Sequence, residues 1–234
     1  MSIRVVSNRV VTTRVVTNRV VTNRVVLLDQ FMTEMMKDAY IDSDIYYTKR
    51  EIYNHFISLL FKQTGLQETD TLSSISTIIP KAMNYTDVET MAFHLSLQLH
   101  YLEKQGFSLF FWQPSDISVI RIMHKHTEQT LYLLANLSQL VPLYKEDLSQ
   151  LSLVYPSVFP FPPERCAPEL FNMKVLPFIT HRSASYYSLG LLCLWCLNIS
   201  YENLSLEKLQ GTKLFYFLER CLKKVPAERV LLYL

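Results

Sequence analysis

Glycine is scarce in this chain, which has only 4 among 234 residues and none before Gly65. Glycine has no Cβ atom and adopts positive φ freely, so it lets a backbone come close to a phosphate group. The sequence therefore excludes a glycine-rich phosphate-binding loop from the part of the chain that precedes Gly65. It also contains neither a Walker loop nor a dinucleotide-binding fingerprint.

Charge is sparse as well: charged residues make up 19% of the chain, and the formal net charge is +2. A dedicated nucleic-acid-binding protein would carry a dense basic face. We therefore predict no nucleic-acid partner. Hydrophobic residues reach 49%, which is enough apolar material for a sizeable core.

Cysteine is limited to four residues, Cys166, Cys193, Cys196 and Cys221. They do not form the framework of a small secreted protein, and the N-terminus shows no export signal. We expect buried free thiols in a reducing compartment, and hence an intracellular, cytoplasmic protein. The alternative is a zinc module that combines cysteines with His124 and His126, although solvated histidines explain that turn more simply.

Residues 4–26 repeat a five-residue unit, RVVSN, RVVTT, RVVTN, RVVTN and RVV. A period of five does not match the two-residue period of a strand, so successive repeats would turn their valines to opposite faces. We predict that residues 1–26 are a low-complexity arm and a solvated tail; contact of its arginines with an acidic surface is the alternative. Residues 27–71 are assigned to a reduced, helical N-terminal segment, and residues 72–234 to the main domain.

Helices are predicted from capping signals and apolar spacing. Thr48 and Glu51 form a capping-box pattern before a helix that Gly65 ends. Thr86 and Glu89 form a second one, before a run of apolar residues at helical spacing. The sequence thus predicts two long helices in its first half.

The second half has shorter predicted elements. Apolar, β-prone stretches predict strands over 108–111, 117–122 and 130–135, and a last helix is expected over 212–224. Seven of the ten prolines lie in residues 142–177, which predicts an irregular segment that wraps a surface.

Residues 183–201 contain no charged side chain. The stretch is long enough for a membrane span, but serine, tyrosine and asparagine dilute its hydrophobicity. We predict a fully buried central helix and no membrane contact, and a membrane-associated protein that uses residues 183–201 is the alternative.

The order of several motifs resembles the protein-kinase family. In that family a long helix ends in Tyr-Leu and a glycine, and the catalytic loop HRDLKPEN, an APE motif, a DxWSLG motif and a terminal Cys-Leu…Pro…Arg pattern follow. The matching residues here are Tyr101, Leu102, Gly106, Pro114, Ala167, Pro168, Glu169, Ser185 to Gly190, Cys221, Leu222, Pro226 and Arg229. With its altered motifs, the sequence looks most like the diverged kinase-like proteins of large DNA viruses.

The resemblance implies a fold and a set of structural residues. We expect a mainly α (α+β) fold, with a kinase C-lobe-like domain over residues 72–234 and a reduced N-terminal part. The resemblance also implies a buried ion pair between Glu169 and Arg229, and structural roles for Pro168 and Gly190.

The kinase positions that carry charge are altered in this chain. Phe111 aligns with the catalytic aspartate, and a phenyl ring cannot accept a proton. Gln113 aligns with the loop lysine and Asn136 with the magnesium-binding aspartate of the DFG motif, so both positions lose their charge. Asp116 aligns with the magnesium-binding asparagine and could still ligate a cation.

The resemblance therefore implies a pseudokinase, a catalytically inactive domain that acts as a protein-binding or scaffold module without cofactor or metal. The alternative enzyme is an atypical protein kinase or ATP-binding protein that uses Asp116 and another acid such as Asp147. The sequence does not identify the protein partner or the oligomeric state. The candidate contact surfaces are the arm and a group of aromatic residues, Tyr144, Tyr155, Phe159 and Phe161.

Overall fold

The computed structural model describes residues 23–35, 43–67, 70–77, 79–144, 146–153, 164–172, 175, 178–200 and 206–231. Most of the predicted arm, and the aromatic residues Tyr155, Phe159 and Phe161, lie outside them. The helices of the described chain are α1 Asn23–Met35, α2 Ser43–Thr64, α3 Tyr85–Lys104, α4 Ala184–Cys196 and α5 Lys213–Cys221. Its strands are β1 Thr71–Ser76, β2 Phe107–Leu109, β3 Ile117–His124, β4 Thr127–Leu134, β5 Leu140–Tyr144, β6 Asp147–Leu153 and β7 Phe178–His181.

The first sheet has three antiparallel strands in the order β1-β3-β4. Strands β3 and β4 form a hairpin whose pairs run from Ile117 opposite Leu134 to His124 opposite Thr127. Lys125 and His126 make the turn with φ values of 45° and 69°. Two consecutive positive φ values give a turn whose twist matches that of the flanking strands.

The second sheet has four strands in the order β2-β5-β6-β7, and its pairs are also antiparallel. Strand β5 begins with a pairing to β2, in which Pro142 lies opposite Phe107. Its pairing to β6 starts only at Leu143. Pro142 therefore lies where β5 pairs with β2 alone, and a residue without an N–H group is tolerated there.

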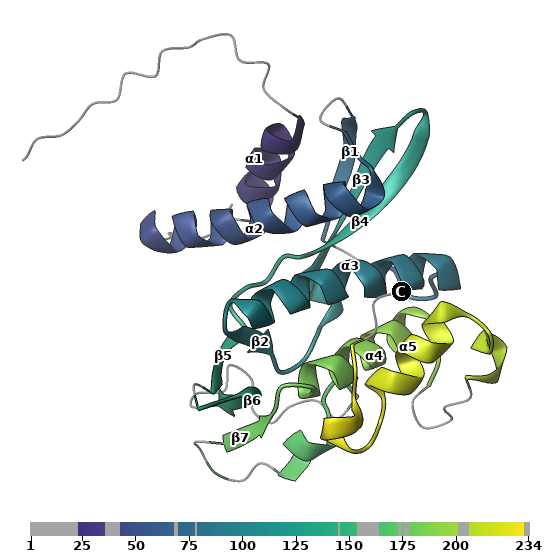
Figure 1. The fold of residues 1–234 in the computed structure, drawn as a ribbon. Coiled ribbons are helices and arrows are strands. Elements are labelled where there is room, and N and C mark those ends of the chain that lie inside the picture. The colour runs from purple at the N-terminus through teal and green to yellow at the C-terminus, as the bar shows by residue number, and fades with distance from the viewer. Residues whose placement is uncertain are drawn as a thin grey trace, which may run out of the picture.

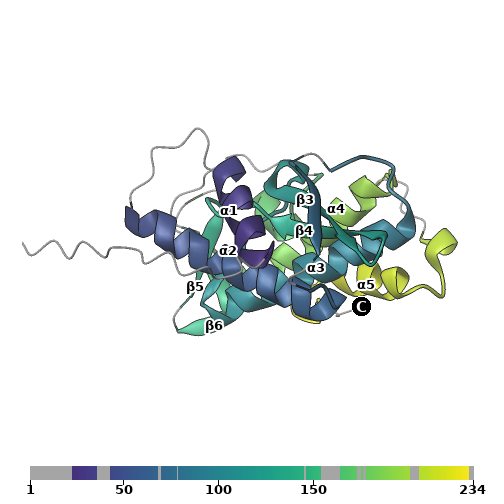
Figure 2. The same cartoon turned by 90° about the horizontal axis from the view of Figure 1, so that it is seen from above.

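Helix α3 is the centre of the molecule (Figure 1). It contacts α2 and β4 on one side and α4, α5 and β2 on the other. Helices α1 and α2 lie next to the three-stranded sheet, and the view from above shows α1 crossing over α2 (Figure 2). The four-stranded sheet extends from the end of α3 where β2 begins (Figure 1).

The start of each long helix differs from the prediction. Helix α3 is capped by Asn84, whose side chain accepts a hydrogen bond from the Asp87 amide at 2.8 Å, so the capping box predicted at Thr86 is wrong. Helix α2 already begins at Ser43, and Thr48 lies inside it, so that box is wrong too. The predicted end is confirmed: α2 stops at Thr64, and Gly65 follows with φ of 70°.

Helix α4 is buried along almost its whole length: 12 of its 13 residues are buried. The prediction of a buried central helix in the uncharged stretch is confirmed. Its 13 residues are fewer than a membrane-spanning helix needs. Across the described part of the chain, no helix combines the length and the apolar character needed to cross a membrane.

The expected fold class, a mainly α kinase-like C-lobe with a reduced N-terminal part, is wrong. The described chain is an α+β structure with two antiparallel sheets. The proline-rich segment was expected to be irregular, yet its described residues supply strands β5 and β6. Strand β1 was also missed, because its residues, TLSSIS, alternate too weakly between apolar and polar to signal a strand.

Candidate functional site

The loop between β2 and the short 3-10 helix Pro114–Asp116 lies inside the protein. Phe110, Phe111 and Trp112 are each 4% exposed or less. Phe111, at the position of a catalytic base in the kinase pattern, is therefore a core residue. Its ring contributes to packing and can neither accept nor donate a proton.

Two serines of α4 fix the position of Trp112. The Ser188 hydroxyl oxygen accepts a hydrogen bond from the Trp112 amide at 2.7 Å, and the indole N–H donates to the Ser185 carbonyl at 3.2 Å. The same Ser188 hydroxyl donates to the Arg165 carbonyl at 2.5 Å. The buried loop, α4 and the segment around Arg165 are thus tied together at one point.

Asp116 is 4% exposed, and both of its carboxylate oxygens have partners. Oδ1 accepts from the Asn136 side-chain amide at 3.0 Å, and Oδ2 accepts from the Gln113 backbone amide at 3.0 Å. Burial raises the pKa of this carboxyl group, while the hydrogen bonds from Asn136 and Gln113 and the charge of Arg165 act against that rise. The carboxylate therefore closes its own turn and joins it to the end of β4.

Asn136 is engaged at both side-chain atoms. Its Nδ2 donates to Asp116, and its Oδ1 accepts from the Ser138 amide at 3.0 Å and from the Ser138 hydroxyl at 2.6 Å. The structure thus brings Gln113, Asp116 and Asn136 together as a hydrogen-bonded cluster. Among the described residues, no group of three or more histidine, cysteine, aspartate or glutamate side chains could hold a metal ion.

Helix α2 also contacts the end of β4, next to this cluster. The Tyr53 hydroxyl donates to the carbonyl of Ala135, the residue next to Asn136. The Tyr53 ring is 2% exposed, and Phe31 of α1 packs edge-on against it with ring centroids 4.9 Å apart. The end of β4 is therefore covered by α1 and α2.

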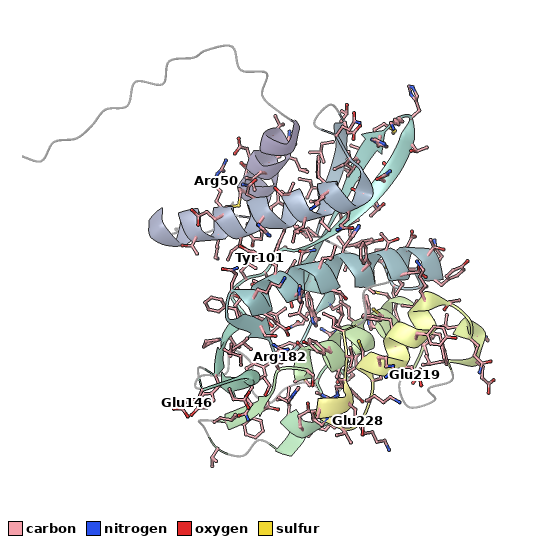
Figure 3. The ribbon with its side chains drawn as sticks, viewed as in Figure 1. Arg50, Tyr101, Glu146, Arg182, Glu219 and Glu228 are labelled. Carbon is pink, nitrogen blue, oxygen red and sulfur yellow. The ribbon has the colours of Figure 1, made fainter. Side chains whose placement is uncertain are left out.

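A second contact between α2 and α3 flanks this cover. The His55 ring stacks on Tyr101 with centroids 3.8 Å apart, and Phe56 meets the same tyrosine edge-on. Tyr101 is marked on α3 just below α2 in Figure 3. Together with the Tyr53 hydrogen bond, these rings hold the N-terminal helices against the body of the protein.

Arg229 and Glu169 form the ion pair that the kinase-like pattern implies. Nη1 and Nη2 of Arg229 donate to the two carboxylate oxygens of Glu169 at 2.5 and 2.9 Å. Arg229 also donates to the carbonyls of Lys223 and Lys224 and lies over the Tyr187 ring, 4.7 Å from its centroid. The pair joins the segment that starts at Pro168 to the turn after α5.

Gly190 of α4 packs against the end of α5 and the residue that follows it. A Cβ atom at this position would lie 2.9 Å from Cδ2 of Leu222 and 3.3 Å from Cβ of Cys221. Only a residue without a side chain allows the two helices to pack at this distance. Gly190 therefore contributes to the packing of α4 against the end of α5.

The remaining sequence candidates lie elsewhere. Asp147 is on β6, where hydrogen bonds from the Ser149 hydroxyl and amide lower its pKa. Tyr144 donates to Glu146 at 3.0 Å. His124 Nδ1 bonds to a carboxylate oxygen of Asp70 at 2.7 Å. All four thiols are free and buried.

A hollow of about 800 Å³ opens beside the Asp116 cluster. It shares Trp112, Pro114 and Arg165 with the neighbourhood of the cluster, and Arg165 donates to the Gln113 side chain at 3.5 Å. The sequence did not predict this hollow, nor the roles of Tyr53, Ser185 and Ser188. The serines in the uncharged stretch were a usable signal, because buried hydroxyl groups need partners.

No protein-family model matches the chain, and the search among curated proteins gives no match.

Proposed function

We propose that the chain, whose sequence motifs resemble those of protein kinases, is catalytically inactive and acts by binding another protein inside the cell. Its relatives in this proposal are the diverged kinase-like proteins of large DNA viruses, and its place of action is the cytoplasm. Phosphoryl transfer needs a proton acceptor and charged groups that position metal and phosphate. One observation carries the proposal: the position of the proton acceptor is Phe111, which is buried in the core.

The surroundings of Phe111 support the same proposal. Asp116 is the one acid of the cluster, and both of its carboxylate oxygens accept hydrogen bonds from within the protein. The side-chain oxygen of Asn136 accepts a hydrogen bond from the Ser138 amide. A metal–nucleotide complex would have to break these contacts before it could bind there.

The structural ion pair that the motif pattern implies, by contrast, is retained. The pair between Glu169 and Arg229 has bidentate geometry, and Arg229 is 4% exposed. A chain that keeps a structural ion pair but has no chemistry at the catalytic position is suited to recognition. This contrast between retained scaffold and lost chemistry favours a binding module over an enzyme.

The experiment is a thermal-shift measurement on the full chain with millimolar ATP, with and without magnesium. A ligand at 100 times its dissociation constant stabilises a protein by about 2.7 kcal/mol, so weak binding registers as a shift. We expect no shift in a sample that melts cooperatively. A magnesium-dependent shift that Asp116→Asn abolishes would contradict the proposal of a catalytically inactive protein. It would favour the alternative of an ATP-binding protein.

A further inference from the structure

The hollow beside the Asp116 cluster has the size of a small-molecule site. Its volume is about 800 Å³, and sites for small ligands span roughly 300–1,000 Å³. Three of its lining residues, Trp112, Tyr187 and Leu191, are each 4% exposed or less and form its base. The hollow is therefore closed at this base, and a ligand has to be held by the lining side chains that solvent reaches.

The accessible part of the lining is largely apolar. Phe171 is 50% exposed, and Trp195 is the one residue of α4 that is not buried. Pro168 and Ile199 are half-buried and also line the hollow. Contact with these side chains removes apolar surface of a ligand from water, which favours binding. The lining is therefore suited to a ligand with an apolar body.

The chain has 2 tryptophans, and both line the hollow. Trp112 is fixed at the base, since its indole N–H donates to the Ser185 carbonyl at 3.2 Å. Trp195 is half-buried, so a ligand that contacts its large aromatic face displaces water there. The tryptophan fluorescence of the whole protein thus comes from this hollow, and a ligand bound there is expected to change it.

The charged side chains of the lining favour an anion. Lys81 and Arg165 carry positive charge and Glu164 carries negative charge, which leaves an excess of one positive charge. Asp116 does not line the hollow, and both of its carboxylate oxygens are bonded within the protein. A ligand with one anionic group therefore complements the lining better than a neutral or cationic ligand does.

The backbone beside the hollow has a conformation that residues with a side chain disfavour. Ala82, the neighbour of Lys81, has φ of 63°, and Asn198 has φ of 57°. Outside the hairpin turn, they are the only non-glycine residues of the described chain with positive φ. The Met83 amide donates to the Cys196 carbonyl at 2.7 Å and joins the two segments. Strained backbone of this kind clusters at ligand-binding sites, which supports a site here.

We infer that the hollow binds a small amphiphilic anion, a molecule with an acyl or aromatic body and one carboxylate. The body contacts Phe171 and Trp195, and the carboxylate meets Lys81 and Arg165. Such a ligand needs neither a metal ion nor a phosphate group. The inference goes beyond the proposed protein-binding function and does not depend on it.

The test measures the tryptophan fluorescence of the full chain, excited at a wavelength that tyrosine does not absorb. Two acids are titrated, decanoate with an acyl body and phenylbutyrate with an aromatic one, together with their neutral alcohols, decanol and phenylbutanol. We expect a saturable change with at least one acid and a lower affinity for its alcohol. The acid that binds more tightly shows whether the body is acyl or aromatic.

Two substitutions separate the body of the ligand from its charge, each with a matched control on another surface. Lys81→Glu is paired with Lys213→Glu, and Phe171→Ser with Leu148→Ser; all four side chains are exposed, so the fold is expected to survive. Because Lys81→Glu reverses a charge, it should weaken binding of the acid by about tenfold and leave the alcohol unchanged. Phe171→Ser should weaken the acid and the alcohol alike. The controls should change neither, and circular dichroism melts verify folding.

Three results would overturn the inference. If none of the acids and alcohols gives a saturable change, the hollow does not bind small amphiphiles. Equal affinities for acid and alcohol, unchanged in Lys81→Glu, would rule out an anionic ligand. Binding that survives both Lys81→Glu and Phe171→Ser would place the site elsewhere. In each case the proposed function would stand, because its test uses ATP and magnesium and none of these ligands.

Discussion

Gln98 of α3 pairs with Tyr132 of β4 in the way that a neighbouring strand would. Its Nε2 donates to the Tyr132 carbonyl at 2.9 Å, and its Oε1 accepts from the Leu134 amide at 2.9 Å. One turn earlier on the same face of α3, His94 Nδ1 accepts from the Tyr132 amide at 3.3 Å. Strand β4 is at the edge of its sheet, so two helix side chains satisfy backbone groups that have no partner strand.

Replacement of Gln98 by methionine is expected to cost about 2–6 kcal/mol of unfolding free energy. The change leaves one buried carbonyl and one buried amide without a partner, and each such group costs about 1–3 kcal/mol. Urea denaturation measures the loss. Gln105→Met is the control, because Gln105 is exposed at the end of the same helix. Equal effects of the two changes would show that the pairing to β4 contributes nothing.

His94 gives the protein an acid-sensitive contact. Burial lowers the pKa of this histidine from 6.5 to about 4, and the folded state needs the neutral ring as an acceptor. The unfolded chain takes up a proton below pH 6.5 and the folded chain only near pH 4, so stability falls as pH drops through this range. Between pH 7 and pH 5 the expected loss is about 2 kcal/mol.

The measurement for His94 is urea denaturation at pH 7 and pH 5. His94→Asn keeps an acceptor without a titratable ring, so its stability should change less over this interval than that of the wild type. His126→Asn is the control: His126 is exposed in the hairpin turn, and asparagine tolerates its positive φ. An unchanged pH dependence in His94→Asn would rule out His94 as its source.

The success of the sequence predictions depended on how strongly each element was patterned. Helix α3 was found because its buried positions recur at helical spacing over 20 residues. Strands β5 to β7 were missed because they are short, because Pro142 lies in the first of them, and because β5 also pairs with β2, and β6 with β7, over a long stretch of chain. Strand pairing at long range is a tertiary property that local pattern does not encode.

The candidate site was predictable in part for the same reason. The motif alignment named Phe111, Gln113, Asp116 and Asn136, and the last three do cluster. It could not show that Tyr53 covers the adjacent carbonyl, because α2 and the end of β4 are 82 residues apart. Nor could it show the hollow beside the Asp116 cluster, whose lining comes from five separate stretches of the chain.

Glu169→Leu is expected to destabilise the protein by about 3–5 kcal/mol, because it leaves the guanidinium of Arg229 buried without its anion. The double variant Glu169→Leu/Arg229→Met should recover part of this loss, since it removes the stranded charge. Urea denaturation of both variants tests the coupling. The control is Glu219→Leu on α5 (Figure 3), which breaks an exposed pair with Lys223 just after the helix. Its effect should stay near zero. If the loss in the double variant equals the sum of the losses in Glu169→Leu and Arg229→Met, the two residues are not coupled.

Phe111→Asp restores the residue type of a catalytic base but is not expected to restore catalysis. Phe111 is 2% exposed, so the carboxylate would be placed in the core at a cost of at least about 4 kcal/mol. Phe111→Leu, which keeps the site apolar, should cost about 1–2 kcal/mol. Denaturation curves and a phosphate-release assay measure the two effects. A stable, ATP-hydrolysing Phe111→Asp variant would show that the position lies in a working cleft.

Gly190→Ala tests the close packing of α4 against α5. The added methyl group would lie 2.9 Å from Cδ2 and 3.1 Å from Cγ of Leu222, and overpacking of this kind costs about 1–3 kcal/mol. In a Leu222→Ala background only the 3.3 Å contact with Cβ of Cys221 remains, so the same change should cost less than it does in the wild type, and the higher helix propensity of alanine offsets part of that cost. Urea denaturation of the four chains gives both values. If Gly190→Ala has the same effect in both backgrounds, Leu222 does not set the distance between the helices. The effect of the substitution would then come from the backbone of α4 alone.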